Sequence, residues 1–262
     1  MDGFESAYLK LDRASALNES VQKATSDWSD SLDLTMSAAT EPSTKGEGFD
    51  VVVRLHGIKP VPASLSIELD ECLHHIRSSL DHAVWQLVKD HGGALDRQAF
   101  PIFEKSPPPK QMAVYIAGLP DKTVEVIKAI QPYNGPKGPK ASKLWWVHKL
   151  DIAAKHQSVV PLASGVSQVH IRIPDDDIGG KKIYLPQFAA TDSDSATLVR
   201  VRGVRQDYVP LPPEEWTGYG EERRLVLFFP ALDAPKIPPP LKELTDWIYY
   251  VRRTIARLEQ ER

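Results

Sequence analysis

The sequence predicts an α+β protein, a helical bundle with an antiparallel β segment inserted before its C-terminal helix. Long segments at both ends of the chain repeat apolar residues at steps of three and four, which is typical of helices that share a core. Over 159–230 the period changes to two, which is typical of strands. We therefore expect a bundle over 1–158 with one strand near 49–55, a β-rich segment over 159–235, and a C-terminal helix over 236–262 that packs back on the bundle.

The first third of the chain shows two long helical patterns with one strand between them. Residues 6–33 repeat apolar side chains at helical spacing, and the valine-rich run 49–55 predicts a strand. Between these elements, residues 41–47 are polar and contain Gly and Pro, which predicts a loop. The clearest helical pattern covers 65–91, with Ser64 as its N-cap and a Gly-Gly pair at its end. Its continuous apolar seam places this helix in the core.

Prolines interrupt the middle of the chain. Residues 101–109 predict an irregular stretch. A short helix follows over 124–131, with Asp121 as its cap, and ends before Pro132. The next helix, over 143–157, is apolar on both sides, so we expect it at the centre of the bundle.

The β-rich segment alternates apolar residues with arginine. We expect its strands to form an antiparallel sheet that covers one face of the bundle, with the arginines on the outer face. These arginines are our candidates for contacts with RNA phosphates, and they are Arg172, Arg200, Arg202 and Arg205. The alternative interpretation is an ordinary solvated sheet face.

The C-terminal helix has an unbroken apolar pattern. Its six apolar positions are Leu241, Leu244, Ile248, Val251, Ile255 and Leu258. Flanking aromatic residues widen this face beyond what a two-stranded coiled coil needs, which favours packing against 6–33 and 65–91 of the same chain. The alternative is that the helix forms the seam of a homodimer.

Composition and charge limit the classes of function. The net charge is only −3, so any contact with RNA must rest on a local patch. The single cysteine, Cys72, excludes an intramolecular disulfide and a cysteine-rich zinc site. The first residues lack the basic region and apolar run of a signal peptide, and apolar stretches such as 113–119 are far shorter than a membrane span. We therefore expect a cytoplasmic protein that does not associate with membranes.

A dense polar run lies on the helix predicted over 65–91. Residues 71–82 read ECLHHIRSSLDH. At about 100° per residue, Arg77 and Asp81 border the apolar seam, whereas His74 lies further round the helix. The simplest interpretation is a solvated face with two border residues that neighbouring groups satisfy.

A second charged pair lies on the helix predicted over 143–157. Asp151 and Lys155 are spaced i, i+4 near its apolar face. Together with Arg77 and Asp81 they predict a buried network of four charges, with at least one ion pair between the two helices. Such a network either fixes the register of the helices or takes part in catalysis.

Arg77 and His82 form an Arg-x4-His motif, which resembles the signature of the HEPN superfamily. These helical proteins include metal-independent ribonucleases of toxin and antiphage systems. The wider run is similar to a group of uncharacterised bacterial proteins with a Leu-Arg-Ser-Ala-Leu-Asp-His helix. In that group a Phe-Pro-Ile segment, a Gln-Pro-Tyr turn and a Leu-Asp-x3-Lys-His segment follow. Here these three segments stand at 100–102, 131–133 and 150–156.

The resemblance covers roughly residues 48–160 and implies RNA cleavage by transesterification, without a metal or other cofactor. His82 would act as general base on a ribose 2′-hydroxyl or as acid on the leaving oxygen, because histidine titrates near neutrality. Arg77 would stabilise the charge that builds on the phosphate, with Asp81 beside it. The supporting residues would be His74, Ser78, Asp151, Lys155 and His156. HEPN nucleases commonly dimerise, so a homodimer is also implied.

Two other classes of function stay open. One is a non-catalytic interaction protein whose bundle dimerises or docks a partner. The other is a metal protein, since Glu71 and His74 match half of a di-iron helix motif, but the chain contains no second Glu-x-x-His. There is also no P-loop, dinucleotide fingerprint or nucleophile elbow. The favoured prediction is a HEPN-like RNA-cleaving or RNA-binding protein that holds no metal.

Overall fold

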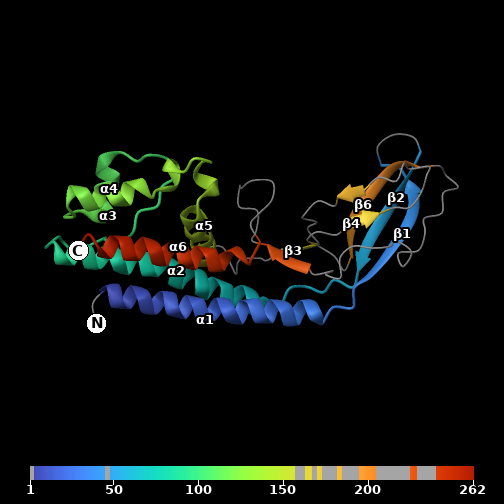
Figure 1. The fold of residues 1–262 in the computed structure, drawn as a ribbon, viewed down its shortest axis with the longest axis horizontal. Coiled ribbons are helices and arrows are strands. Elements are labelled where there is room, and N and C mark those ends of the chain that lie inside the picture. Colours follow the sequence, from blue (N-terminus) through green and yellow to red (C-terminus); the bar gives the residue numbers. More distant parts are fainter. Residues whose placement is uncertain are drawn as a thin grey trace.

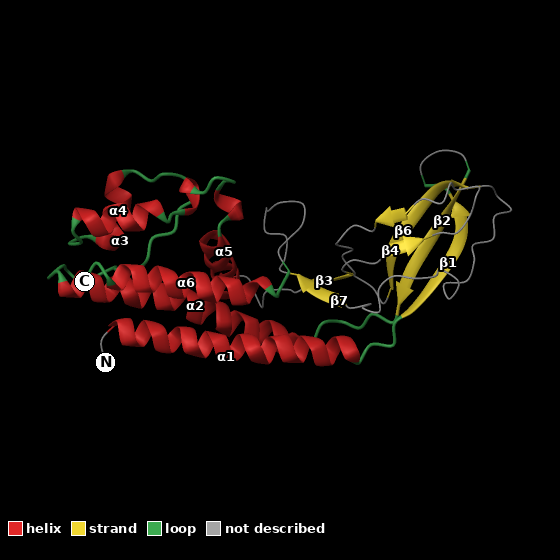
Figure 2. Ribbon diagram, viewed as in Figure 1, coloured by secondary structure: helices red, strands yellow, loops and turns green. Residues whose placement is uncertain are grey.

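The protein combines a helical body with a small antiparallel sheet (Figures 1 and 2). A computed structural model describes residues 3–44, 48–156, 163–166, 170–172, 182–184, 195–204, 225–228 and 240–262. Within these ranges the predicted combination of helices and antiparallel strands is confirmed. The predicted position of the strands along the chain needs correction.

The helices lie close to where the periodicity predicts them, with one addition. They are α1 (Gly3–Asp30), α2 (Ala63–Asp90), α3 (Pro109–Ile116), α4 (Asp121–Ala129), α5 (Lys143–His156) and α6 (Glu243–Glu259). Helix α3 was not predicted, because its prolines indicated an irregular stretch. Pro109 is the first residue of α3, where a missing N–H costs no hydrogen bond. In the described part of the chain no helix is both long and apolar enough to cross a membrane.

Two predicted helix caps are wrong by one or two positions. Ser64 lies inside α2, whose N-cap position is Pro62. Asp121 is the first residue of α4, whose N-cap position is Pro120. In both cases the proline before the helix fixes an extended backbone and so sets where the helix begins. Asp121 still carries a negative charge in the first turn of α4, which suits the helix dipole.

Helices α1, α2 and α6 lie side by side and share one core (Figure 1). All six apolar positions predicted for the C-terminal helix are buried. Polar contacts join α6 to α1 as well, since Asn18 donates to Thr245 at 2.9 Å and Tyr8 donates to Glu259 at 2.8 Å. Helix α6 therefore packs against α1 and α2 of the same chain.

The principal sheet is built on a hairpin that directly follows α1. Strands β1 (Thr35–Pro42) and β2 (Phe49–His56) pair antiparallel, and β6 (Ser195–Val204) pairs antiparallel with the other edge of β2. We did not predict β1, because its sequence TMSAATEP lacks the alternation of apolar and polar residues that marks a half-buried strand. The predicted loop over 41–47 therefore begins inside β1.

The predicted insertion before the C-terminal helix is thus corrected. Two strands of this sheet, the edge strand β1 and the central strand β2, form the hairpin after α1, and among the described residues of 159–235 only β6 joins them. Two short antiparallel pairs also lie in that segment: β3 (Ala163–Val166) with β7 (Leu225–Phe228), and β4 (His170–Arg172) with β5 (Lys182–Tyr184). The prediction that the sheet covers a face of the bundle is wrong for this three-stranded sheet. It lies beyond the end of the bundle at which α1 ends and α2 begins (Figure 1).

Candidate functional site between helices α2 and α5

The predicted catalytic pair Arg77 and Asp81 binds the backbone of Phe100. Arg77 Nη1 donates to Asp81 Oδ1 at 2.5 Å, and Nη2 donates to the carbonyl oxygen of Phe100 at 2.7 Å. The amide of Phe100 donates to the same Asp81 oxygen at 2.8 Å. Phe100 is fully buried, so its two backbone groups need partners inside the protein. The ion pair supplies both of them.

Gln131 holds the residues that follow Phe100. Its side-chain amide donates to the carbonyl oxygen of Pro101 at 2.7 Å and accepts from the amide of Phe103 at 3.0 Å. Gln131 is itself buried, at the end of α4. The Phe-Pro-Ile and Gln-Pro-Tyr segments noted in the sequence are therefore joined by hydrogen bonds between one side chain and the backbone.

The same stretch also reaches α5, through Glu104. This carboxylate accepts from the indole N–H of Trp145 at 2.7 Å and from Lys149 Nζ at 2.8 Å. We call residues 100–104 the hub segment, because they connect α2, the end of α4 and α5. These contacts help to set the position of α5 relative to α2.

A second group of contacts joins α2 to α5. It consists of His74, Asp151 and Lys155, which we call the open cluster. Asp151 Oδ1 lies 3.4 Å from His74 Nδ1, and its Oδ2 accepts from Lys155 Nζ at 2.7 Å. The Asp151 side chain is 4% exposed, whereas His74 is 51% and Lys155 is 47% exposed. One buried carboxylate thus holds an imidazole and an ammonium group that both reach the solvent.

His148 lies beside the open cluster and was not among our candidates. Burial, and then the positive charge of Arg77, lower the pKa of its imidazole from 6.5 to about 4. Its Nδ1 is buried and has no hydrogen-bond partner among the described residues. His148 is therefore neutral at pH 7. The only signal in the sequence was its position three residues before Asp151, on the same side of a helix.

His82 faces a different neighbour from Arg77. Its Nδ1 lies 2.7 Å from the hydroxyl oxygen of Ser6 on α1. Burial, and then the charge of Lys10, lower the pKa of His82. Since Arg77 is bonded to the hub segment and His82 to α1, this chain does not bring the two residues of the Arg-x4-His motif together.

The predicted network of four charges forms in part. Each of the two ion pairs among these residues joins side chains of a single helix. Arg77 pairs with Asp81 in α2, and Asp151 pairs with Lys155 in α5. The predicted ion pair between the two helices among these four is wrong, because Arg77 donates to the hub segment. His74 makes the contact across the helices instead.

Two supporting residues add little to the geometry. Ser78 is partly buried and makes no hydrogen bond to another described residue. His156 is the last residue of α5, and only its backbone is described.

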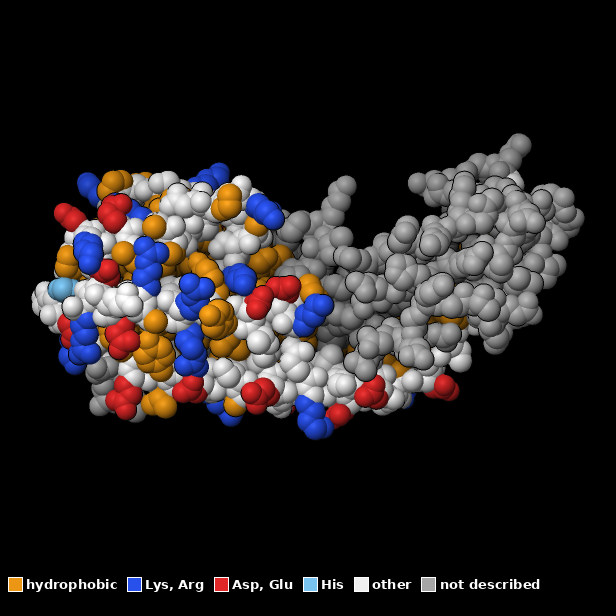
Figure 3. Space-filling view, in the orientation of Figure 1, with side chains coloured by type: hydrophobic (Ala, Val, Ile, Leu, Met, Phe, Trp, Pro, Cys, Tyr) orange, Lys and Arg blue, Asp and Glu red, His pale blue; other side chains and the backbone are white. Residues whose placement is uncertain are grey.

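The four candidate arginines for RNA binding lie in or near the sheet. Arg172 ends β4, while Arg200 and Arg202 stand opposite Val52 and Asp50 of β2. Arg205 lies outside the described residues. On the helical body, basic and acidic side chains are interspersed over the face shown in Figure 3, so the described part of that face has no patch of a single sign.

Neither a group of metal ligands among the described residues nor a match to another protein adds a further assignment. Among the described residues no group of three His, Cys, Asp or Glu side chains is placed to hold a metal ion. Comparisons of the chain with family models, curated proteins and solved structures find no match. The HEPN resemblance therefore stays a prediction from sequence.

Proposed function

We propose that this chain is a metal-independent RNA-cleaving or RNA-binding protein, and that the open cluster is its site. The observation that carries the proposal is the buried Asp151 carboxylate, which holds exposed His74 and Lys155 from two helices. A carboxylate near Nδ1 of a histidine favours the tautomer that leaves Nε2 able to accept a proton. The 3.4 Å separation suits an unliganded site, where such contacts are often long.

The chemistry follows from these three side chains. His74 Nε2 takes the proton of a ribose 2′-hydroxyl, and the oxygen attacks the adjacent phosphorus. The bond from phosphorus to the 5′-oxygen breaks, and that oxygen takes a proton from water. The products are a 2′,3′-cyclic phosphate and a 5′-hydroxyl. Lys155 stabilises the negative charge on the phosphate oxygens, and Asp151 stabilises the imidazolium that His74 becomes.

In this proposal Arg77 and Asp81 are positioning residues. Arg77 is only 8% exposed, and its guanidinium already donates to Asp81 and Phe100. Because Arg77 is buried, contact with an RNA phosphate would require its side chain to move to the surface, which would leave the Phe100 carbonyl buried without a partner. The pair acts on the open cluster through the hub segment. We retain the cytoplasmic location and the homodimer of the sequence prediction as parts of the proposal.

The proposal is tested by incubating the purified protein with an RNA oligonucleotide in EDTA. We expect products that end in a 2′,3′-cyclic phosphate, and no cleavage of RNA in which every 2′-hydroxyl is methylated. RNA binding without cleavage would restrict the proposal to its binding form. Cleavage that needs Mg²⁺ and also acts on DNA would contradict it, because neither the cyclic product nor the 2′-hydroxyl would then be involved.

A second candidate, a non-catalytic interaction protein, is favoured by large apolar side chains on helix surfaces. Leu9 on α1 is 50% exposed, Trp85 on α2 is 38% exposed and Tyr249 on α6 is 61% exposed. Aromatic residues are enriched where proteins meet. If this second function is correct, the protein leaves RNA intact and light scattering shows that it self-associates. Tyr249→Ser should then weaken the association. A monomer at all concentrations would remove the dimeric form of this candidate.

A further inference from the structure

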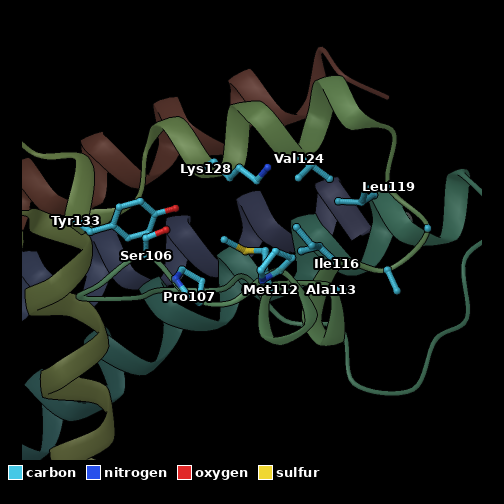
Figure 4. A pocket seen from close by; sticks show the side chains of 12 residues that line it. Ser106, Pro107, Met112, Ala113, Ile116, Leu119, Val124, Lys128 and Tyr133 are labelled. Carbon is cyan, nitrogen blue, oxygen red and sulfur yellow. The ribbon is translucent and has the colours of Figure 1, made fainter.

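A cavity of about 560 Å³ opens between α3 and α4, on elements that the open cluster does not use (Figure 4). Its volume lies within the range of small-molecule sites in proteins. Met112 and Ile116 of α3 are nearly buried and line it together with Val124 of α4. Most of its wall is therefore apolar, and much of that wall is already formed by ordered helices.

Polar groups gather at one end of this cavity. Figure 4 shows the side chains of Tyr133 and Ser106 together at one end, with Ile116 and Leu119 toward the other. Neither hydroxyl has a hydrogen-bond partner among the described residues. Both can donate to a ligand.

Lys128 of α4 also lines the cavity and supplies a positive charge; in Figure 4 its side chain points along α4 toward Val124, and it turns toward Tyr133 to reach the two hydroxyls. Its Nζ donates to Glu125 at 2.7 Å, and the side chain is 45% exposed. An ammonium group has three hydrogens, so this bond leaves two for a ligand. The pair is on the surface, where such bonds contribute little and exchange partners readily.

We infer that the cavity binds a small amphipathic carboxylate, with its tail between α3 and α4 and its head at Lys128, Tyr133 and Ser106. The apolar wall removes the tail from water, which is the main source of affinity. The two hydroxyls and the ammonium group donate to the carboxylate oxygens, which only accept. This inference concerns other residues than the proposed RNA site, and neither depends on the other.

The test is titration of the full chain with decanoate, below its micelle concentration, by isothermal calorimetry. We expect saturable binding of one decanoate per chain. Ala113→Trp fills the cavity and should weaken binding by about tenfold or more. Val114→Trp is the matched control, because Val114 neighbours Ala113 on α3, is 49% exposed and does not line the cavity. If Ala113→Trp does not fold, Ala117→Trp, which also fills the cavity, replaces it.

The head group is tested with decanol and with Lys128→Gln. Decanoate should bind about fivefold more tightly than decanol, and Lys128→Gln should remove that preference while decanol binding stays the same. Absence of saturable binding, or equal loss in Ala113→Trp and Val114→Trp, would overturn the site. Equal affinity for decanol and decanoate would overturn the assignment of a carboxylate.

Discussion

Two ion pairs with the same sequence spacing have different surroundings in this protein. Arg77 and Asp81 in α2, and Asp151 and Lys155 in α5, are each an i, i+4 pair of opposite charges. In the first pair the cation is buried, with a side-chain exposure of 10%, and both members bind the backbone of Phe100. In the second pair the anion is buried, and the cation reaches the solvent.

These surroundings determine which of the two pairs is able to contact a substrate. A buried cation bonded to a carboxylate and to a backbone carbonyl stabilises the fold, because removing it leaves the carboxylate without its counter-charge and the carbonyl without a partner. An exposed cation on a buried carboxylate keeps donors for a ligand. We therefore expect substitutions in the first pair to reduce stability, and substitutions in the second to reduce activity.

The largest effect on stability is expected for Arg77→Met. Removing the guanidinium takes the counter-charge from Asp81, which keeps only the Phe100 amide, and leaves the Phe100 carbonyl without a partner, so the free energy of unfolding should fall by about 4 kcal/mol. Urea denaturation measures it. The control is Arg97→Met, because Arg97 pairs with Asp96 on the surface, with side-chain exposures of 77% and 85%, and should change stability by less than about 0.5 kcal/mol. Equal effects of the two substitutions would remove the distinction between the pairs.

The next effect concerns pH and His148. Its pKa falls from 6.5 to about 4 on folding, so the unfolded chain binds a proton at a higher pH than the folded chain does. The stability that the neutral imidazole of His148 contributes is fully present above pH 6.5. As the pH falls toward 4 the free energy of unfolding decreases by roughly 3 kcal/mol.

Urea denaturation between pH 7 and pH 4 checks this prediction. His148→Gln should make stability less dependent on pH, whereas the same change at the exposed His91 should not. An unchanged slope in His148→Gln would show that this histidine is not held neutral.

Gln131→Leu should have a smaller effect, because both groups that it leaves unpaired belong to the backbone. The Pro101 carbonyl and the Phe103 amide lose their partner, so stability should fall by about 2 kcal/mol. The exposed Asn134, which donates to the Lys128 carbonyl at 2.7 Å, provides the control. If Asn134→Leu lowers the stability as much as Gln131→Leu does, the hydrogen bonds of Gln131 to the hub segment are not specifically stabilising.

The smallest effect on stability is expected in the open cluster. Lys155→Gln should lower the free energy of unfolding by only about 1 kcal/mol, because Lys155 is 47% exposed, while the buried Asp151 carboxylate keeps His74 as a partner. The same substitution should slow RNA cleavage by about tenfold or more. Lys143→Gln, at the other end of the same helix and paired with Asp246 of α6, should leave the rate within about twofold. A large loss of stability in Lys155→Gln would show that both pairs are structural.

The sequence predicted those parts of the fold that depend on local periodicity. The apolar stripes of α2 and α6 recur over several turns, so their helices and the buried face of each were predicted correctly. Strand β1 was missed, since a strand whose residues are small and partly exposed shows no alternation. Helix α3 was missed because prolines stand both in the loop before it and at its first position.

The three residues of the open cluster were named from the sequence only as supporting residues, beside Arg77, His82 and Asp81 as the catalytic ones, and their arrangement was not predicted. The sequence indicated His74, Asp151 and Lys155, because polar side chains on helices of the core require either a partner or a function. It did not show that Arg77 would bond to Phe100, a contact between residues far apart in the chain. Nor did it show the role of Gln131, since its two backbone partners come from a segment that only the fold brings beside it.

Cleavage of RNA in EDTA by His74→Gln and by His82→Gln distinguishes the open cluster from the Arg-x4-His motif. His74 lies against the buried Asp151 of α5, whereas His82 lies against Ser6 of α1. We predict that His74→Gln slows formation of the 2′,3′-cyclic phosphate by about 100-fold and that His82→Gln stays within about threefold of the wild type. Both rates are referred to the folded fraction of each variant. The opposite order, with His82→Gln inactive and His74→Gln active, would contradict the account and return the chemistry to the Arg-x4-His motif.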